Sequence, residues 1–168
     1  CGLGFKPLLV AGTPEQQQLF CELIADGGFA AFALTEPSAG SDASGVRTSA
    51  KQEGDEWVIN GSKCFITCAE YAQVFTVIAQ TDKSKGVKGL TAFLVEADRP
   101  GISIGNHEDK MGIRTSNTCD VFFDNLRVPS DHIIGKVGDG FKIAMMTLDM
   151  ARPVVGAVAT GISQTCVD

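Results

Sequence analysis

The segment from Leu34 to Asp42 carries small and hydroxyl-bearing side chains, which makes it the first candidate for chemistry. It follows a β-prone run, so we expect a strand that leads into a loop, with Thr35 at the strand end and able to meet a polar ring edge. Around Gly40, small side chains leave backbone N–H groups accessible, and with the Ser41 hydroxyl these could hold a phosphate. A plain turn between strands is the alternative.

A second candidate is the segment Cys64-Phe65-Ile66-Thr67. If it is a strand, alternation sends Phe65 and Thr67 to the same face. An aromatic ring beside a hydroxyl suits a flavin, because the first packs against the flavin ring and the second hydrogen-bonds it. Taken alone, the same two residues are also ordinary filler of a strand, in the core or on the surface.

Two arginines could bind anions or the tail of a polar ligand. Arg114 follows the segment 110–113 and could clamp an anion, but we favour the simpler interpretation that it supports its loop through backbone carbonyls or a nearby acid. Asp149 and Arg152 stand three residues apart on an expected helix and therefore share a face. They form either a solvated pair or a contact to a ligand tail, beside a kink expected at Pro153.

The composition argues against several classes of function. Hydrophobic residues make up 44% of the 168 residues and charged residues 20%, which is typical of an ordinary folded domain. The formal charge of −6 opposes general nucleic-acid binding, because such binding neutralises phosphates with Lys and Arg. The six cysteines show no repeated CxxC pattern and only two histidines are present, so we expect no metal site and reduced, mostly buried thiols.

The ends and the hydropathy of the chain also lead to expectations. No apolar run reaches the roughly eighteen residues that cross a bilayer, and the first residues carry no charged signal-peptide region. We therefore expect a cytoplasmic protein without a transmembrane segment. The chain does not begin with Met, and residues 164–168 hold no helix stop signal, so we expect a fragment of a longer polypeptide.

A short helix is predicted near the start of the chain. Thr13 is a suitable N-cap, Pro14 favours the first helical turn, and Gln16 can complete a capping box. The helix should end near Ala25, before the helix-terminating pair Gly27-Gly28.

A second helix is predicted from Asp139 onward, where apolar residues recur with helical spacing. Pro153 should kink this helix or restart it, because proline lacks the backbone donor and clashes with the preceding turn. The expected apolar face consists of Phe141, Ala144, Met145, Leu148, Val155, Val158 and Ile162.

Between the two helices the sequence consists of short β-prone runs separated by turn residues. We expect a two-residue hairpin turn at Asn60-Gly61 and another turn at Glu53-Gly54-Asp55. Many short strands favour a mainly β barrel or sandwich over a parallel sheet with crossover helices. The expected strands are Phe29–Leu34, Gly45–Gln52, Glu56–Ile59, Lys63–Ile66, Val74–Gln80, Leu90–Val95, Ile102–Ile104, Cys119–Phe123 and Leu126–Val128.

Five motifs, taken together and in order, resemble the acyl-CoA dehydrogenase family over essentially the whole chain. They are TEPSAGSD, NGSKCFIT, MGIRTS, VPSDHIIGKVGDGF and LDMARP, at about the family's spacing. The resemblance implies a mainly β, acyl-CoA dehydrogenase-like middle-domain β-barrel flanked by short helical segments. Residues 1–28 would end an N-terminal helical domain, residues 29–138 would form the barrel that binds flavin and acyl-CoA, and residues 139–168 would begin a C-terminal helical domain.

The resemblance also implies a cofactor, FAD, and residues that bind it. In family members the segment that matches 32–41 lines the flavin, so Thr35 would bond the ring and Ser41 would face phosphate or the acyl-CoA. Phe32, Leu34 and Gly40 belong to the same segment.

Further roles are implied for the later motifs. Thr67 would donate to flavin N5, with Phe65 beside the ring and Ile66 next to them, and a hydrogen bond to N5 would orient the ring. Asp149 and Arg152 match positions that touch CoA. Phe65 stands where many members have Trp, and Leu34 where many have Val, so the aromatic or apolar character is kept.

The implied reaction is FAD-dependent α,β-dehydrogenation of an acyl-CoA thioester. A Glu removes the α-proton while the β-hydrogen leaves as hydride to flavin N5. Family members place that Glu far along the C-terminal domain or on the helix next to the Arg, where this sequence has Ala151. We therefore expect no catalytic residue in this chain and a base beyond Asp168, so that the chain alone is inactive and binds FAD weakly.

The resemblance implies partners and leaves alternatives. The partners are the acyl-CoA substrate, an electron-transfer flavoprotein and further copies in a homotetramer, in the cytoplasm or, in a eukaryote, the mitochondrial matrix. Acyl-CoA oxidases and flavin monooxygenases use the same scaffold but let the reduced flavin meet oxygen. A non-catalytic β-barrel that binds an apolar ligand or a partner is the third possibility. The length of the acyl chain is left open.

Overall fold

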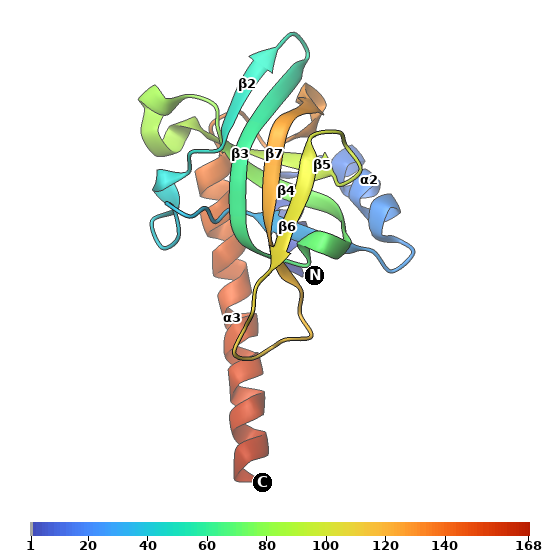
Figure 1. The fold of residues 1–168 in the computed structure, drawn as a ribbon, viewed down its shortest axis with the longest axis vertical. Helices are drawn as coiled ribbons and strands as arrows, with labels where there is room; N and C mark the ends of the chain where they lie inside the picture. Colours follow the sequence, from blue (N-terminus) through green and yellow to red (C-terminus); the bar gives the residue numbers. More distant parts are fainter. Residues whose placement is uncertain (1) are drawn as a thin grey trace.

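The computed structural model describes residues 2–168, and its centre is one eight-stranded sheet (Figure 1). The strands are β1 (Phe29–Ala33), β2 (Ser49–Glu53), β3 (Glu56–Thr67), β4 (Ala72–Gln80), β5 (Leu90–Glu96), β6 (Ile102–His107), β7 (Thr118–Pro129) and β8 (Ile133–Ile134). Their order is β6-β7-β3-β2-β4-β5-β8, and β1 pairs with β4 beside that path. The expected mainly β fold is confirmed, but β6 and β8 are edges, so the open sheet is a barrel only loosely.

Three helices flank the sheet, namely α1 (Gly2–Ala11), α2 (Pro14–Ile24) and α3 (Gly140–Val167). One hydrophobic core lies within the folded sheet and includes Phe75 and Phe93, while a second joins the sheet to the helices and includes Ile78. Strand β4 contributes to both cores, because its side chains alternate between the two faces. Burial of β4 on both faces therefore explains why its sequence is a nearly continuous apolar run.

Helix α2 begins as predicted. Thr13 Oγ1 accepts a hydrogen bond from Gln16 N at 3.2 Å, and Gln16 Oε1 accepts one from Thr13 N at 3.2 Å, which completes the capping box. Gln16 Nε2 also donates to the carbonyls of Asp131 at 2.6 Å and Ile133 at 2.8 Å. The cap residue therefore also ties α2 to the edge of the sheet at β8.

Helix α1 was not predicted, because its segment contains two glycines and Pro7. Tertiary packing explains the helix instead. A Cβ atom at Gly4 would lie 2.7 Å from the Cβ of Ala30 in β1, so only glycine allows this approach of helix and strand. Leu8, on the same helix, is fully buried in the core between sheet and helices.

The predicted hairpin at Asn60-Gly61 is wrong. Strand β3 continues through this pair with a shift of its register against β7, and Gly61 lies opposite Phe123 of β7. Gly61 has a φ of 148°, and an added Cβ would lie 2.7 Å from Thr48 Cα, so glycine serves a close approach and not a turn. The hairpin is at Gly54, where the φ of 63° lets β2 turn into β3.

Two other strand boundaries differ from the expectation. The runs 119–123 and 126–128 form one strand, β7, because Asn125 with a φ of 50° is accommodated inside it. Strand β2 begins only at Ser49, since residues 43–45 form a short 3₁₀ turn. The other expected strands are confirmed to within a few residues at each end.

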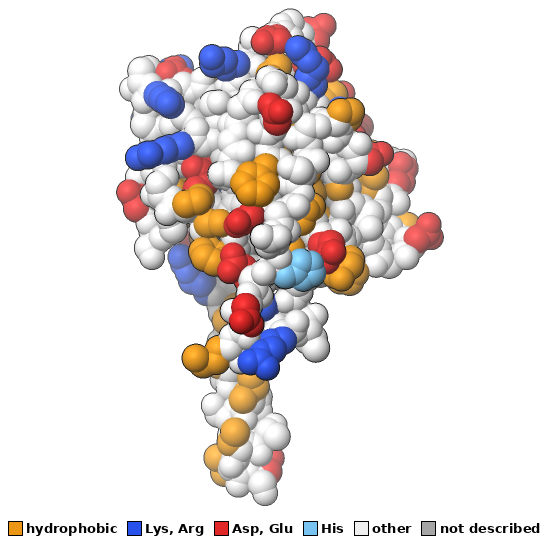
Figure 2. Space-filling view, viewed as in Figure 1, with side chains coloured by type: hydrophobic (Ala, Val, Ile, Leu, Met, Phe, Trp, Pro, Cys, Tyr) orange, Lys and Arg blue, Asp and Glu red, His pale blue; other side chains and the backbone are white. Residues whose placement is uncertain are grey.

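Helix α3 continues through Pro153 as one element, so the expected restart is wrong. Ile143 and Ala144 in its first half are buried against the sheet. The second half extends away from the sheet in Figure 1, and Figure 2 shows apolar side chains along it. Of the expected apolar face, the exposed members are Val155, Val158 and Ile162.

By length and mean hydropathy, α3 qualifies as a helix that could cross a membrane. The expected absence of a transmembrane segment is therefore not confirmed. The core helix of a folded domain can have the same length and hydropathy.

Of the five cysteines that the structure describes, Cys64 and Cys119 are buried, Cys68 is half-buried, and Cys21 and Cys166 are exposed. The expectation of mostly buried thiols is therefore wrong for the described cysteines, and Cys1 lies outside the described residues. The division into segments 1–28, 29–138 and 139–168 stays a prediction. Residues from all three segments share the core between the sheet and the helices.

Candidate functional site

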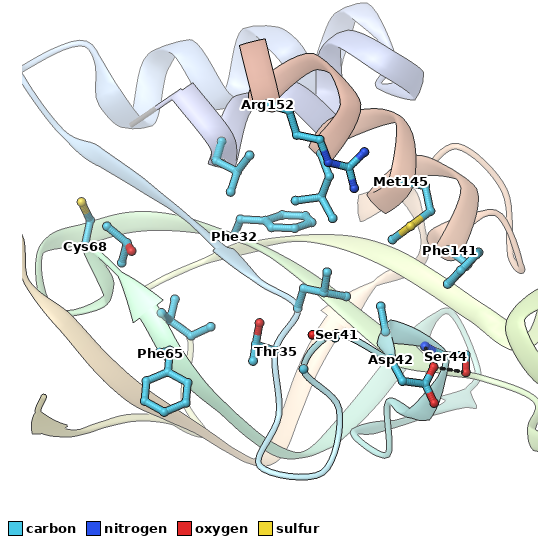
Figure 3. Close-up of a pocket in the computed structure, with 18 of the residues that line it drawn as sticks. Phe32, Thr35, Ser41, Asp42, Ser44, Phe65, Cys68, Phe141, Met145 and Arg152 are labelled. Atoms are coloured by element: carbon cyan, nitrogen blue, oxygen red, sulfur yellow. Dashed lines mark hydrogen bonds between the residues drawn. The ribbon is translucent and has the colours of Figure 1, made fainter. Parts of the chain in front are cut away.

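A cavity of about 800 Å³ lies between the loop after β1, the end of β3 and the first half of α3 (Figure 3). Its apolar lining includes Phe32 from β1 and Met145 from α3, and hydroxyl groups come from the loop and the strand end. The cavity thus joins an apolar surface to a polar one, which is the usual character of a small-molecule site.

The structure gathers nine of the ten predicted site residues around this cavity. Thr35 and Thr67 come from the ends of two different strands and line the same cavity, as the flavin hypothesis requires. Their proposed contacts with a cofactor stay predictions. The nine residues are Phe32, Leu34, Thr35, Gly40, Ser41, Phe65, Ile66, Thr67 and Arg152.

Backbone pairing explains why the two strand ends meet. Cys64 N donates to the carbonyl oxygen of Thr35 at 2.9 Å, so the chain leaving β1 runs beside β3. Glu36 and Ala39 then exchange two backbone hydrogen bonds of 3.0 Å each, which turns the chain back tightly. This turn, rather than a side chain, brings Ser41 to the mouth of the cavity.

The hydroxyl groups on the cavity fit the polar edge of a flat heteroaromatic ring. Within residues 2–168, neither Thr35 Oγ1 nor Thr67 Oγ1 has a hydrogen-bond partner in the protein. Each hydroxyl can donate one hydrogen bond and accept others, and the apolar side chains nearby suit a ring face. The donors present therefore fit the flavin implied by the sequence.

Phe65 reaches the cavity through an irregular backbone and not through simple alternation. Its φ is 57°, a left-handed value that is rare for an aromatic residue, and the register of β3 with β7 shifts between Lys63 and Ile66. Such bulges re-aim a side chain. Phe65 is 61% exposed while Ile66 is buried, so the bulge turns the ring outward at the cavity edge.

Arg152 and Asp149 form an exposed ion pair on α3. Arg152 lines the cavity. Asp149 does not line it, and its link to the cavity is the ion pair with Arg152. Both side chains are 67% exposed, so the pair itself contributes little stability. The geometry leaves the guanidinium available to an anionic or polar ligand tail.

Arg114 is not among the residues that line this cavity. Its Nε donates to the carbonyl oxygen of Lys110 at 2.9 Å, which supports the loop between β6 and β7. The favoured interpretation, a loop-supporting arginine, is confirmed.

A buried ion pair behind the cavity was missed in the sequence. Lys63 Nζ lies 2.8 Å from Glu36 Oε1 and 3.0 Å from the carbonyl oxygen of Leu34, and both charged side chains are almost fully buried. Glu36 also accepts hydrogen bonds from Arg47 N at 2.7 Å and Thr48 N at 3.0 Å. The only signal in the sequence is a charged residue within a β-prone run, because the partner lies far away along the chain.

The two charges perturb each other's protonation. Burial lowers the pKa of Lys63 to about 8, against the opposing attraction of the Glu36 carboxylate. Burial by itself would raise the pKa of Glu36. The Lys63 charge and the hydrogen bonds from Lys63, Thr48 and Arg47 outweigh it, so the pKa of Glu36 is lowered overall.

Glu36 should therefore make the fold acid-sensitive. Because the folded pKa lies below the ordinary value of 4.5, its stabilising contribution is complete above pH 4.5 and is lost as the pH falls through the folded pKa. Thermal unfolding followed from about pH 7 to about pH 3 should show a steeper decline for the natural protein than for Glu36→Gln, which has no carboxylate to protonate. Parallel curves for the two proteins would contradict this assignment.

Other cavity residues could not be singled out from the sequence as site residues. Phe141, Met145 and Leu148 were expected on the apolar face of the helix, but their place above the cavity depends on how α3 packs. Leu3 and Gly4 belong to α1, for which no sequence signal exists.

A family model and a related protein both match the part of the chain that forms the sheet and the cavity. The sequence model of the family described as acyl-CoA dehydrogenase, middle domain, matches residues 31–126. The probable acyl-CoA dehydrogenase FadE25 of Mycobacterium leprae is 47% identical over 167 residues, which cover 99% of this chain and 43% of that protein.

Solved structures are similar over nearly the whole chain. Butyryl-CoA dehydrogenase from Megasphaera elsdenii gives a TM-score of 0.92 at 46% identity and covers 97% of this chain and 43% of that one. A chain in the structure of the electron transferring flavoprotein of Acidaminococcus fermentans gives a TM-score of 0.93 at 48% identity. The match covers 97% of this chain and 43% of that one. The chain thus spans about 43% of the length of these relatives.

Proposed function

Because the chain belongs to the acyl-CoA dehydrogenase family, we propose that it forms the flavin-binding part of an FAD-dependent enzyme that dehydrogenates acyl-CoA thioesters. The observation that carries the proposal is the shared cavity of Thr35 and Thr67, with their hydroxyls free of protein partners within residues 2–168. A ring with polar edges placed there would be held on both sides.

We assign the cofactor contacts to the two strand ends. The Thr67 hydroxyl would donate to the ring nitrogen N5, and Thr35 would bond the pyrimidine edge, which together fix the orientation of the ring. Phe65 would lie beside the ring, and Phe32, Leu34 and Ile66 would supply apolar contact. The small residues around Gly40 and Ser41 leave room for a phosphate to approach the backbone.

Substrate contacts are assigned to the side of α3. Ser41 lies at the cavity and would face the phosphate or the thioester. The Arg152 guanidinium, held by Asp149, would contact the polar CoA tail.

The chemistry needs a base, and the position next to Arg152 does not supply one. Bound FAD would supply the hydride acceptor. The chain's residues would orient the ring and shield it from water, while Ala151 next to Arg152 carries no group that can take a proton. We assign the base to a Glu outside these 168 residues.

The biological setting is proposed from the same premise. Electrons would leave through an electron-transfer flavoprotein, and the enzyme would act as a homotetramer in a bacterial cytoplasm or a mitochondrial matrix. One similar structure is named for butyryl-CoA, so a four-carbon thioester is the first substrate to test.

The test is FAD binding followed by reduction. The complete natural polypeptide, stripped of flavin, should regain the yellow flavin spectrum in about one-to-one ratio on addition of FAD, and butyryl-CoA should then bleach it. A protein that takes up no flavin would contradict the proposal and favour a non-catalytic β-barrel. Rapid reoxidation by oxygen, instead of by an electron-transfer flavoprotein, would assign an oxidase.

A further inference from the structure

The buried ion pair between Lys63 and Glu36 lies directly behind the polar side of the cavity and takes no part in the chemistry described so far. Both side chains are almost completely shielded from solvent, which is costly for two charges unless they are paired and hydrogen-bonded. Replacement of such a pair by apolar residues is often neutral for stability. The cost of burying both charges therefore points to a role other than stability.

We propose that Lys63 is a positioning residue for the flavin site, which fixes and polarises the peptide unit between Leu34 and Thr35. This inference rests on the proposed function, because it assigns Lys63 a part in holding the flavin. The ammonium of Lys63 donates to the carbonyl oxygen of Leu34 at 3.0 Å. The Thr35 N–H belongs to the same planar peptide unit and points away from that carbonyl.

The charge of Lys63 affects the Thr35 N–H through the amide group that joins Leu34 and Thr35. A positive charge on a carbonyl oxygen draws electron density from the amide, so the N–H of the same unit becomes a stronger donor. Charge-assisted hydrogen bonds are also shorter and stronger than neutral ones, which restricts rotation of the peptide plane. Thr35 lines the cavity, and in this inference its N–H would meet a ligand there together with its hydroxyl, so that the position and donor strength of the peptide unit affect binding.

Glu36, the partner of Lys63, holds the rest of the loop. Its carboxylate is held by the Lys63 ammonium at 2.8 Å and by the N–H groups of Arg47 and Thr48. These contacts join the two ends of the loop that carries Ser41, because Glu36 begins the loop and Thr48 follows it. Lys63 thus anchors the peptide at Thr35 directly and the rest of the loop through Glu36.

A merely structural role predicts a different set of results, so the test uses variants that separate the two. The double variant Lys63→Met/Glu36→Gln removes both charges and leaves no buried ion, and it should fold. In the complete natural polypeptide it should bind FAD about tenfold more weakly, the loss of one favourable hydrogen bond, and shift the visible absorption of the bound flavin.

A second variant covers the case in which Lys63→Met/Glu36→Gln does not fold. Lys63→Gln/Glu36→Gln also leaves no unpaired buried charge and keeps a neutral donor at position 63, and it should show the same weakening of FAD binding and the same spectral shift, to a smaller extent. The matched control is Arg127→Met, which removes an exposed cation paired with Glu53 and Glu56. The control should leave FAD affinity and spectrum unchanged.

The outcomes separate this inference from the proposal on which it rests. Absence of FAD binding by the natural protein would overturn the proposed function and this inference with it. If the natural protein binds FAD but the folded Lys63 variants have the same affinity and flavin spectrum, the inference alone is overturned. Weaker binding with a shifted spectrum in the Lys63 variants, and not in Arg127→Met, would support it.

Discussion

A variant in which Thr35 and Thr67 are both replaced by valine should bind FAD about 10- to 100-fold more weakly than the natural protein. Each hydroxyl would give one hydrogen bond to the flavin, and a hydrogen bond contributes about 0.5–1.5 kcal/mol. Valine keeps the branched shape of threonine and removes only the polar group. The expected measurement is the dissociation constant from flavin fluorescence in the complete natural polypeptide.

The control for this pair is Thr115→Val, at an exposed threonine in the loop between β6 and β7. It should leave the dissociation constant unchanged. Equal affinities in the double variant and in Thr115→Val would mean that the two hydroxyls do not meet the cofactor, and the assignment of the cavity would be lost.

Truncation of Phe93 to alanine should lower the free energy of unfolding by about 3–5 kcal/mol. Phe93 is fully buried in the core of the sheet, and its ring centroid lies 5.7 Å from that of Trp57. The change leaves a cavity that the surrounding strands cannot fill. Urea unfolding followed by circular dichroism measures the difference.

Phe122→Ala is the matched control on strand β7, since Phe122 is 43% exposed. It removes the same group from a surface position and should cost well under half as much. Similar losses for the two variants would show that the core between the halves of the sheet is not tightly packed.

Local patterns predicted the elements whose signals lie within a few residues. The capping box of Thr13 and Gln16 was predictable because both partners stand in one turn. The β-prone runs gave most strands for the same reason. The prediction at Asn60-Gly61 was wrong because glycine is required there by the close approach of Thr48, which directly precedes β2, and a single sequence does not distinguish that need from a turn.

The site was predictable as a set of residues but not as an arrangement. The motifs identified Thr35 and Thr67, because hydroxyls among small or aromatic residues stand out at a strand end. The support for Thr35 stayed hidden, since the Lys63 and Glu36 charges meet only after β1 and β3 are placed side by side. The bulge at Phe65 could not be predicted either, because the alternating pattern of a strand gives no sign that one residue has a left-handed backbone conformation.

The bulge at Phe65 has a consequence for how this position can vary among related proteins. The direction of the ring is set by the backbone, and most of its surface has no neighbour that a bulkier group would displace. A wider aromatic such as tryptophan could therefore occupy the position without rearranging the interior. Evolution can thus change the size of the ring at the cavity edge while the strands beneath it keep their places.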